Sequence, residues 1–586
     1  MPHAPKNFQK EAYDRANFRI VFNRARNQSI TGLKATCYNV ENGKLTEIKM
    51  TDDNVIVEEI YKDIFVKKVT IPGVREGSII EIKYTITNPS IQDWTFQDEI
   101  PTIWSEYEMQ VPDFYIFTKL GQGFTPYALN DESRKSETLM GTSYTYTLLT
   151  YHYIQKDVPA LKPEKFMSSI EDYRTRLTFH LQEIRPPNGM TQKIMGSWEA
   201  TSKLLTEDDD FGNFIDKKGA LKEELTSIAN PAHSALEKVQ AIYDYVGKNF
   251  EPTEKSFSFY ATSGIKELKK KRKVTPAEMN LVFLNMLNSV GIESNPVIVR
   301  NREDGRVRTT LAALRRFNHV LSWVKLEKDT FFVDASGYPQ PMKLLPFNSL
   351  TGYGVAILGK ESYQILVPQS KVLTRRFTQA NLSLNTEGVL AGSINFTESG
   401  YYALNTKKNI KELGAEKYLQ NRLKNLIADG KMEGVQFENP ENLGDEAPLK
   451  GKVNVSTTAY VTQTDDKIFI SPMLSFGTEE NPFTDEERKF EIDYGNPRDE
   501  MYQISLTIPE GYKPEELPKN IRLTMPDGSA RLEYSIAVIG NKLSLNSKLS
   551  IKKAVFYADE YPFLKELFTT LVAKAGEQIV LTKSTK

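Results

Sequence analysis

A histidine and an aspartate lie on two neighbouring strand-like segments in the middle of this chain. His319 lies in the run 317–324 and Asp334 in the run 330–335, with a short polar turn, 325–329, between them. This pattern is typical of a β-hairpin. With a turn centre near 327, the two side chains come within about one residue of facing each other, so they can touch. Beside a nucleophile, such a pair can catalyse acyl transfer. The alternative is a buried core histidine and an aspartate that caps a strand end.

A buried helix is predicted just before this hairpin. Thr275 precedes Pro276, and Glu278 follows, which is the pattern of a capping box with proline at the first helical position. Gly291 is placed to end the helix. The apolar residues in between wrap almost the whole circumference: Met279, Leu281, Val282, Phe283, Leu284, Met286, Leu287 and Val290. We therefore expect this helix to be buried on nearly all sides.

The first third of the chain has the pattern of a β domain. From about 18 to 154, short β-branched runs such as 55–60, 65–71 and 77–86 follow one another, which favours an all-β sandwich. The period becomes helical from about Thr201. Asn230 and Pro231 then form an N-cap and a first helical position before apolar residues spaced by three and four.

After Gly291 the strand pattern returns and continues to the C-terminus. A strand is expected at 296–299, and from about 375 a hairpin joins 380–384 to 388–396. Further strands are expected at 503–508 and 531–538. One helix, about 415–429, interrupts them, and a late helix is expected at 561–575.

Composition describes a globular chain with material for several cores. The 586 residues are 40% hydrophobic and 26% charged, and 75 basic residues balance 76 acidic ones. No overall field therefore attracts nucleic acid or anionic lipid. Cys37, the one cysteine, lies in a β-prone run and is expected to be a buried inert thiol rather than a nucleophile. No apolar run is long enough to span a bilayer.

Several strings resemble a bacterial, largely Bacteroidota, family that combines a DUF3857 β domain, a transglutaminase-like core and a DUF3858 β domain. The strings are Gly77-Ser78-Ile79-Ile80-Glu81, Trp94-Thr95-Phe96-Gln97, Ala277-Glu278-Met279-Asn280-Leu281, Phe317-Asn318-His319-Val320, Gly400-Tyr401-Tyr402-Ala403 and Pro509-Glu510-Gly511-Tyr512. The resemblance implies an α+β multidomain fold: an N-terminal antiparallel β-sandwich (1–190), a papain-like core (191–370) and a mostly-β C-terminal domain (371–586). It also implies export to the periplasm or cell surface, although the N-terminus has no signal-peptide core.

The same resemblance makes Pro276 the most informative residue of the core. Active members carry a cysteine two residues before the acid that aligns with Glu278, where the helix dipole and a histidine lower the thiol pKa. Proline has no nucleophile and no N–H to line an oxyanion site. Thr275 is adjacent, but an N-cap hydroxyl is expected to bond the helix backbone. The resemblance thus implies a degenerate triad of His319 and Asp334 without its nucleophile.

We also assign residues around this triad to a binding surface: Thr275, Glu278, Asn318, Trp323, Lys271 and Arg272. The basic run 269–273 either binds an acidic ligand or is a solvated loop before the helix, and we favour the loop. The acidic run 207–210 lacks the spacing of a calcium loop. No cofactor or metal motif is present.

Three functions follow. We favour a non-catalytic protein that binds a peptide, glycan or partner protein at the cell envelope. The alternative is an amidase or peptidase of transglutaminase type, which requires a Ser, Thr or Cys within hydrogen-bond reach of His319. Nucleic-acid binding through Lys269–Lys273 is the third, and it is not expected.

Overall fold

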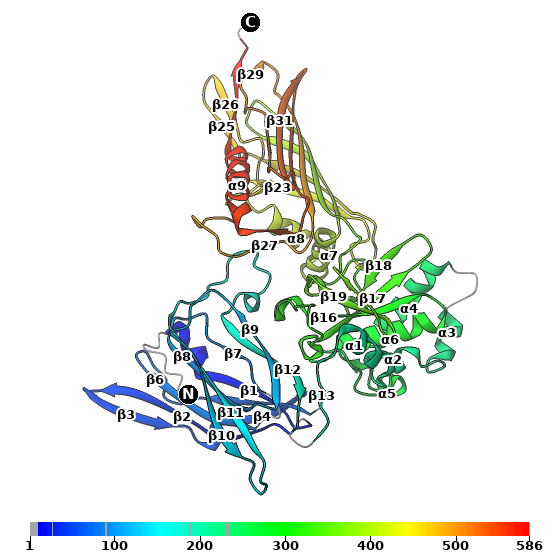
Figure 1. Cartoon of the computed structure of the whole chain (residues 1–586). Coiled ribbons are helices and arrows are strands. Elements are labelled where there is room, and N and C mark those ends of the chain that lie inside the picture. Colours follow the sequence, from blue (N-terminus) through cyan, green and yellow to red (C-terminus); the bar gives the residue numbers. More distant parts are fainter. Residues whose placement is uncertain are drawn as a thin grey trace. The chain divides into compact units, whose positions relative to one another are not determined.

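The computed structural model describes residues 10–25, 27–61, 63–87, 91–186, 189–228 and 234–584. Its contacts separate two units. One comprises Met1–Trp94, Thr118–Gly121 and Arg176–Phe179, and the other comprises Thr95–Phe117, Gln122–Thr175 and His180–Lys586. The expected α+β class is confirmed, because sheet-rich regions precede and follow a helix-containing centre along the chain (Figure 1). The three domain boundaries stay predictions.

The first unit is built from antiparallel strands. They form two sheets, ordered β1-β5-β4 and β3-β2-β6. Their bounds are β1 Asn17–Asn23, β2 Ser29–Glu41, β3 Lys44–Lys49, β4 Val55–Tyr61, β5 Ile64–Thr70 and β6 Ile79–Thr87. These strands confirm the predictions at 55–60, 65–71 and 77–86. Cys37 is fully buried in β2, and the Asn39 amide donates a hydrogen bond to its sulfur at 3.5 Å.

The second unit opens with another antiparallel sheet, ordered β10-β11-β8. Its strands are β8 Thr102–Pro112, β10 Leu129–Thr138 and β11 Thr145–Val158. A separate sheet, divided between the two units, has the order β13-β12-β7, and β9 pairs with β12. Its strands are β7 Trp94–Thr95, β9 Tyr115–Gln122, β12 Arg176–Ile184 and β13 Gln192–Lys193.

The centre of the second unit packs helices on one five-stranded sheet. Its antiparallel sheet has the order β18-β17-β16-β19-β20, with β16 Ser294–Val299, β17 His319–Lys325, β18 Thr330–Val333, β19 Gly354–Gly359 and β20 Ser362–Leu366. The helices are α1 Trp198–Glu207, α2 Gly212–Asp216, α3 Lys222–Ile228, α4 Ala235–Asn249, α5 Ile265–Lys271 and α6 Pro276–Ser289. The short strands β14 Glu251–Pro252 and β15 Lys273–Val274 pair in parallel before α6.

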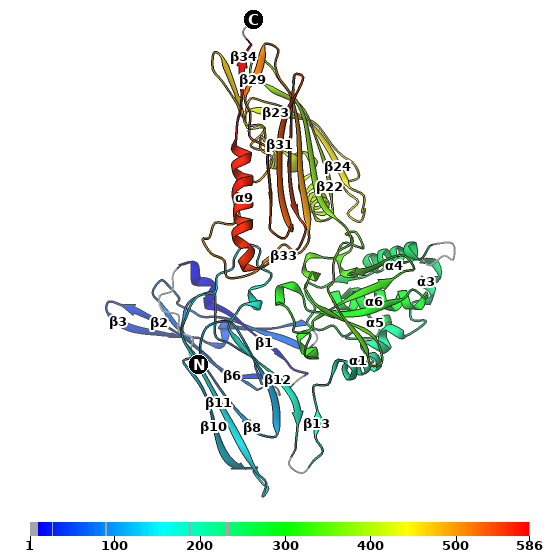
Figure 2. The ribbon, with the colours of Figure 1, turned by 45° about the horizontal axis from the view of Figure 1, so that its top comes forward.

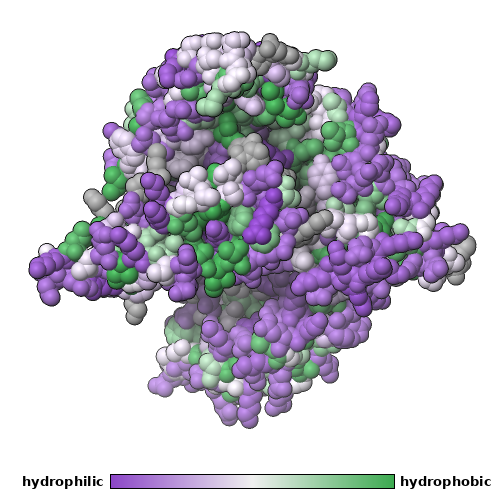
Figure 3. Space-filling model, turned by 90° about the horizontal axis from the view of Figure 1, so that it is seen from below, coloured by the Kyte–Doolittle hydropathy of each residue, from purple (hydrophilic) through white to green (hydrophobic). Residues whose placement is uncertain are grey.

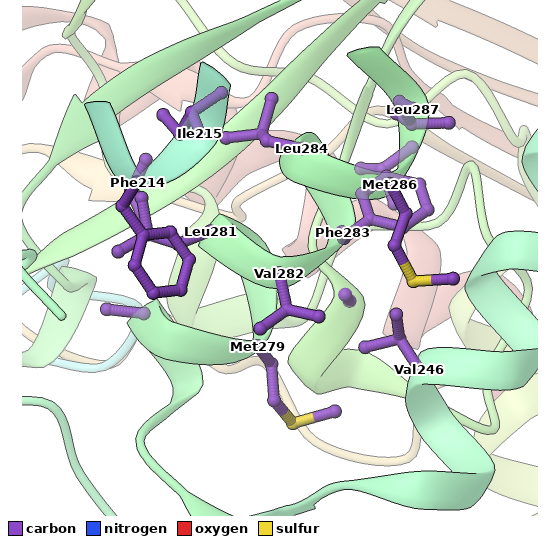
Figure 4. Packing of buried hydrophobic residues seen from close by; sticks show 14 of the residues in the cluster. Phe214, Ile215, Val246, Met279, Leu281, Val282, Phe283, Leu284, Met286 and Leu287 are labelled. Carbon is purple, nitrogen blue, oxygen red and sulfur yellow. The ribbon is translucent and has the colours of Figure 1, made fainter. Parts of the chain in front are cut away.

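Helix α6 is the centre of this core, as the sequence predicted. Every residue from Ala277 to Leu287 is buried. Side chains from opposite sides of the helix pack on neighbours that include Phe214 and Ile215 of α2 and Val246 of α4 (Figure 4). Gly291 ends the helix at φ +76°, and the Ile292 N–H donates to the Leu287 carbonyl at 3.0 Å. A glycine adopts this left-handed backbone without strain.

The start of α4 differs from the expectation. Asn230 and Pro231, the predicted cap, lie outside the described residues. The described helix begins at Ala235, and Ser234 and Glu237 form its capping box. The apolar spacing correctly indicated a helix, while the Ser-x-x-Glu pattern that begins four residues after Asn230 marks its start.

A long sheet dominates the C-terminal region, with the order β23-β24-β22-β21-β28-β32-β31-β30. Its strands are β21 Thr374–Leu384, β22 Leu390–Ser399, β23 Gly430–Phe437, β24 Leu449–Thr457, β28 Arg498–Thr507, β30 Ile521–Thr524, β31 Ala530–Ile539 and β32 Lys542–Ile551. The predicted hairpin around 385–387 is confirmed by the antiparallel pairing of β21 and β22. Two smaller sheets contain β25 Val461–Gln463, β26 Lys467–Ile470, β29 Tyr512–Glu516 and β34 Ile579–Lys583, and β27 Ile492–Asp493 with β33 Val555–Phe556.

The helices of this region agree only in part with the sequence. Helix α9 (Tyr561–Gly576) confirms the late helix, and it packs along β31 (Figure 2). The helix expected at about 415–429 is confirmed in its first part by α8 (Ala415–Arg422), but it ends at Arg422, and a further helix, α7 (Tyr401–Leu413), precedes it. The buried face of α7 includes Thr406 and Lys407, so its apolar period is broken.

Surface character is mixed. Figure 3 shows one face on which apolar residues gather in patches among hydrophilic ones. Within the described residues, no helix combines the length and apolar character needed to cross a lipid bilayer.

Candidate functional site

The histidine and the aspartate meet at the end of the central hairpin. His319 is the first residue of β17, and Asp334 directly follows β18. The register pairs Ser322 with Val333, so the two side chains approach diagonally. The Nε2 atom of His319 lies 2.9 Å from Oδ2 of Asp334. Their exposures are only 2% and 3%. The predicted contact is therefore confirmed, and it lies in a water-poor environment.

Hydrogen bonds surround the Asp334 carboxylate on both oxygens. Oδ1 accepts the Asn280 side-chain amide at 2.8 Å, and the Ser336 N–H and hydroxyl at 3.0 and 2.6 Å. Oδ2 accepts the Ser349 hydroxyl at 2.6 Å. Burial acts to raise the pKa of Asp334, but the charge of His319 and the bonds from His319, Ser336 and Ser349 outweigh it and lower the pKa. The carboxylate is therefore held in its ionised form.

Asn280 joins the hairpin to helix α6. Besides donating to Asp334, its Nδ2 lies 3.1 Å from the Pro276 carbonyl, and its Oδ1 accepts the Ala335 N–H at 2.8 Å. The first turn of α6 is thereby fixed beside the histidine–aspartate pair. Sequence reasoning missed Asn280 as a site residue. The available signal was a polar residue in a helix whose circumference is mostly apolar and therefore buried.

The backbone donors at the start of α6 are already used by the protein. The Glu278 N–H donates to the Thr275 hydroxyl at 3.1 Å, and the Thr275 N–H donates to Glu278 Oε2 at 2.8 Å. The Ala277 N–H donates to Ser256 Oγ at 3.0 Å. Pro276 has no N–H to offer. This arrangement confirms the predicted capping box, occupies the Thr275 hydroxyl, and leaves this turn poorly suited to stabilise an oxyanion.

Glu278 also fastens a loop over the start of the helix. Its Oε1 accepts the N–H and the hydroxyl of Thr262, at 2.9 and 2.6 Å. Together with Ser256, this ties the segment between β14 and α5 to α6. Ser256 and Thr262 contact the start of α6 but could not be selected from the sequence, because both lie in an irregular loop.

The second ring nitrogen of the histidine, Nδ1, has no hydrogen-bond partner among the described residues. This atom of His319 is itself buried. A triad nucleophile would bond to this nitrogen while the other nitrogen bonds the acid. The pair is thus oriented as in a hydrolase, but no hydroxyl or thiol of the described chain bonds the ring where attack would start.

Two other predicted binding residues have structural contacts. Asn318 Oδ1 accepts the Asn301 N–H at 2.9 Å, and its Nδ2 donates to Asp304 at 2.7 Å, so Asn318 holds the turn after β16. Trp323 is half-buried, and its ring is 6.4 Å from that of Phe332. Their roles in binding stay predictions.

The basic run forms part of a helix. The run is exposed to solvent, as expected, but it is not a loop, because residues 269–271 are the last turn of α5. Lys269 pairs with Glu224. Arg272 donates to the carbonyls of Asn249 and Lys248 at 3.3 and 3.4 Å, which caps α4, and Lys271 lies 3.5 Å from the Ser263 hydroxyl. A basic last turn is favourable at a helix C-terminus, which explains the charge locally.

Metal binding has no support in this geometry. Within the residues that the structure describes, no group of three or more His, Cys, Asp or Glu side chains is arranged to hold an ion.

Comparisons with known proteins agree with the fold. The chain is similar over almost its whole length to a crystal structure from Parabacteroides distasonis described as a "putative protease". The TM-score is 0.60 at 14% identity, with 98% of this chain and 94% of the other covered. Among curated proteins, none matches this sequence. Two family models match, both described as domains of unknown function with a solved structure: DUF3857 over residues 8–145 and DUF3858 over residues 466–581. The chain therefore carries a DUF3857 region near its N-terminus and a DUF3858 region near its C-terminus, as its sequence predicted.

Proposed function

We propose that this chain is a non-catalytic protein with a transglutaminase-like core, which binds a peptide, glycan or partner protein at the cell envelope. The observation that carries the proposal is the contact between His319 and Asp334. It is joined to the expectation from the family resemblance that Pro276 occupies the position of the nucleophile. The Thr275 hydroxyl is engaged as an N-cap, so it does not replace the missing thiol. His319 Nδ1 has no hydrogen-bond partner among the described residues and is itself buried, so we propose that it bonds a ligand when the site opens.

A catalytic assay tests the first half of the proposal. Purified protein is expected to show no hydrolysis of peptide amides and no amine incorporation into glutamine-containing peptides. The matched control is His319→Gln, which keeps a polar side chain of similar reach. Turnover by the parent protein that is lost in His319→Gln would contradict the proposal.

Restoring the thiol tests whether the position has been identified correctly. In Pro276→Cys, the new thiol lies at a helix N-terminus and, on this proposal, next to His319, so we expect iodoacetamide to modify it faster than Cys37. Cys37 is an internal reference because it is fully buried. Peptide mapping separates the two sites. Equal, slow modification of both cysteines would place position 276 away from the imidazole.

A peptidase or amidase with another nucleophile is the second candidate, favoured by the description of the structural neighbour. It requires a hydroxyl that reaches His319 Nδ1 on substrate binding. Ser256 is one candidate, because its hydroxyl lies at the start of α6, where it accepts the Ala277 N–H. Covalent labelling of Ser256 by a fluorophosphonate probe would support this function, and its absence would leave the binding function.

A further inference from the structure

A short turn between β18 and β19 completes the histidine–aspartate pair. The 3-10 turn Phe347–Ser349 carries Ser349, which is 2% exposed and donates to Asp334 Oδ2 at 2.6 Å. This is the same oxygen that His319 contacts. The position of the turn therefore bears directly on the geometry of the pair.

Arg302 holds this turn from the core side. One of its guanidinium nitrogens donates to the Leu350 carbonyl at 3.2 Å, and the group lies 4.9 Å from the centre of the Phe347 ring. Arg302 is 8% exposed, so its charge needs a counter-charge. Asp493 of β27 supplies it, accepting at 2.8 Å on Oδ2 and at 3.0 Å on the backbone oxygen.

Two more residues of the C-terminal region contact the same turn. Gly495 has φ +75°, and a Cβ placed on it would lie 2.4 Å from the Phe347 ring, so backbone packs directly on the aromatic face. Tyr401, the first residue of α7, donates from its hydroxyl to the Leu345 carbonyl at 2.7 Å. Its ring meets that of Phe347 edge-on at 6.3 Å.

We propose that the C-terminal region positions the histidine–aspartate pair through this turn. In this series of contacts, Asp493 fixes the position of Arg302. Arg302 in turn holds Leu350 and Phe347, and Gly495 packs on Phe347. Ser349, in the same turn, then holds Asp334 against His319. A partner that shifts the segment 492–495 would loosen the pair, so the site and the C-terminal region act as one conformational device. This inference rests on the pair being the site of the proposed function, but its test measures geometry and needs no ligand.

Hydrogen exchange of the intact chain tests the link. The Ala335 and Ser336 amides donate to Asn280 and Asp334, so they report on the pair. We expect Asp493→Asn, which removes the charge and keeps the shape, to raise exchange in the peptide 334–337 by about tenfold. Ser349→Ala removes the hydrogen bond from Ser349 to Asp334, which is the last contact in the series that runs from Asp493 to the pair. It is expected to raise exchange in 334–337 by the same factor while leaving exchange at 491–495 unchanged.

The control is Glu164→Gln, which weakens the ion pair with Arg488 (3.2 Å) near the same junction without touching Arg302 or the turn. Exchange in 334–337 is expected to stay at the parent value. If Asp493→Asn does not fold, Gly495→Ala replaces it, because the added methyl group must displace Phe347. The inference is overturned if the folded C-terminal variant opens 491–495 but leaves 334–337 protected. Lack of any ligand for the site would contradict the proposed function and would not change these exchange rates.

Discussion

Helices α4 and α6 begin with the same local pattern but in different surroundings. Ser234 and Glu237 form the capping box of α4 at the exposed surface, while Thr275 and Glu278 form that of α6 inside the core. In α4 the Glu237 carboxylate accepts the N–H and the hydroxyl of Ser234, both at 2.8 Å, at the exposed surface. In α6 the second oxygen of Glu278 also accepts the N–H and the hydroxyl of Thr262, in the core. The motif of α6 is therefore a buried junction between a helix and a loop as well as a cap.

This difference bears on why the core keeps its shape without a nucleophile. Three polar side chains form hydrogen bonds around Pro276. Ser256 accepts the Ala277 N–H, Asn280 donates to the Pro276 carbonyl, and Glu278 accepts from the loop, so polar contacts on several sides fix the first turn of α6. Buried polar groups that are fully bonded specify one arrangement, whereas a single lost partner is costly. The geometry of the pair can thus persist for structural reasons, independently of catalysis.

Replacing Glu278 is expected to have the largest effect. Glu278→Ala removes the acceptor of the Thr275 N–H and of two Thr262 donors, all next to a buried helix start. Each buried donor that loses its acceptor costs about 1–3 kcal/mol, so we expect the free energy of unfolding of the core to fall by about 3–5 kcal/mol. Urea unfolding followed by hydrogen exchange in α6 measures it. A loss as small as that of Glu237→Ala in α4 would show that burial of the cap does not matter.

Asn280→Ala is expected to have the next largest effect. It leaves the Ala335 N–H without its acceptor and removes one donor from the Asp334 carboxylate. We expect a loss of about 2–3 kcal/mol, measured as above. The matched control is Gln240→Ala in α4, where a half-buried amide bonds only Asp244 in the described contacts. Similar losses in both variants would argue against a special role for Asn280.

Local patterns in the sequence could predict α6 and its cap, because the capping box, the N1 proline and Gly291 lie within the helix or beside it. The hairpin could also be predicted, since its polar turn sets the register that brings His319 to Asp334. Ser349, Ser256 and Arg302 could not, because their partners are distant in the sequence and nothing in their own segments indicates burial. Asn280 is an intermediate case. The sequence shows a polar residue within a buried helix, but it does not show that the residue bonds to Asp334.

Acid should weaken the buried junction through Asp334. The pKa of Asp334 is lowered in the folded protein, so its contribution to stability is fully present above the ordinary unfolded pKa of about 3.9 and is lost as pH falls toward the folded value. The test compares the parent with Asp334→Asn by urea unfolding between pH 7 and about pH 3. Only the difference between the two curves is informative, because other carboxylates titrate in the same range. We expect this difference to shrink below about pH 4, and a constant difference would contradict an ionised Asp334.

The smallest effect is expected at the exposed cap. Ser234→Ala removes the hydroxyl that accepts the Glu237 N–H at 3.3 Å, at a surface where water can replace it. We expect a loss of about 0.5–1 kcal/mol, confined to exchange at the start of α4. Thr275→Ala removes the equivalent bond in α6, where the buried Glu278 N–H has no access to water and the loss should be larger. The ratio of the two losses isolates the effect of burial, because the sequence pattern around both hydroxyls is the same. Equal losses would mean that the local motif alone, and not the loop fastened over it, stabilises the start of α6.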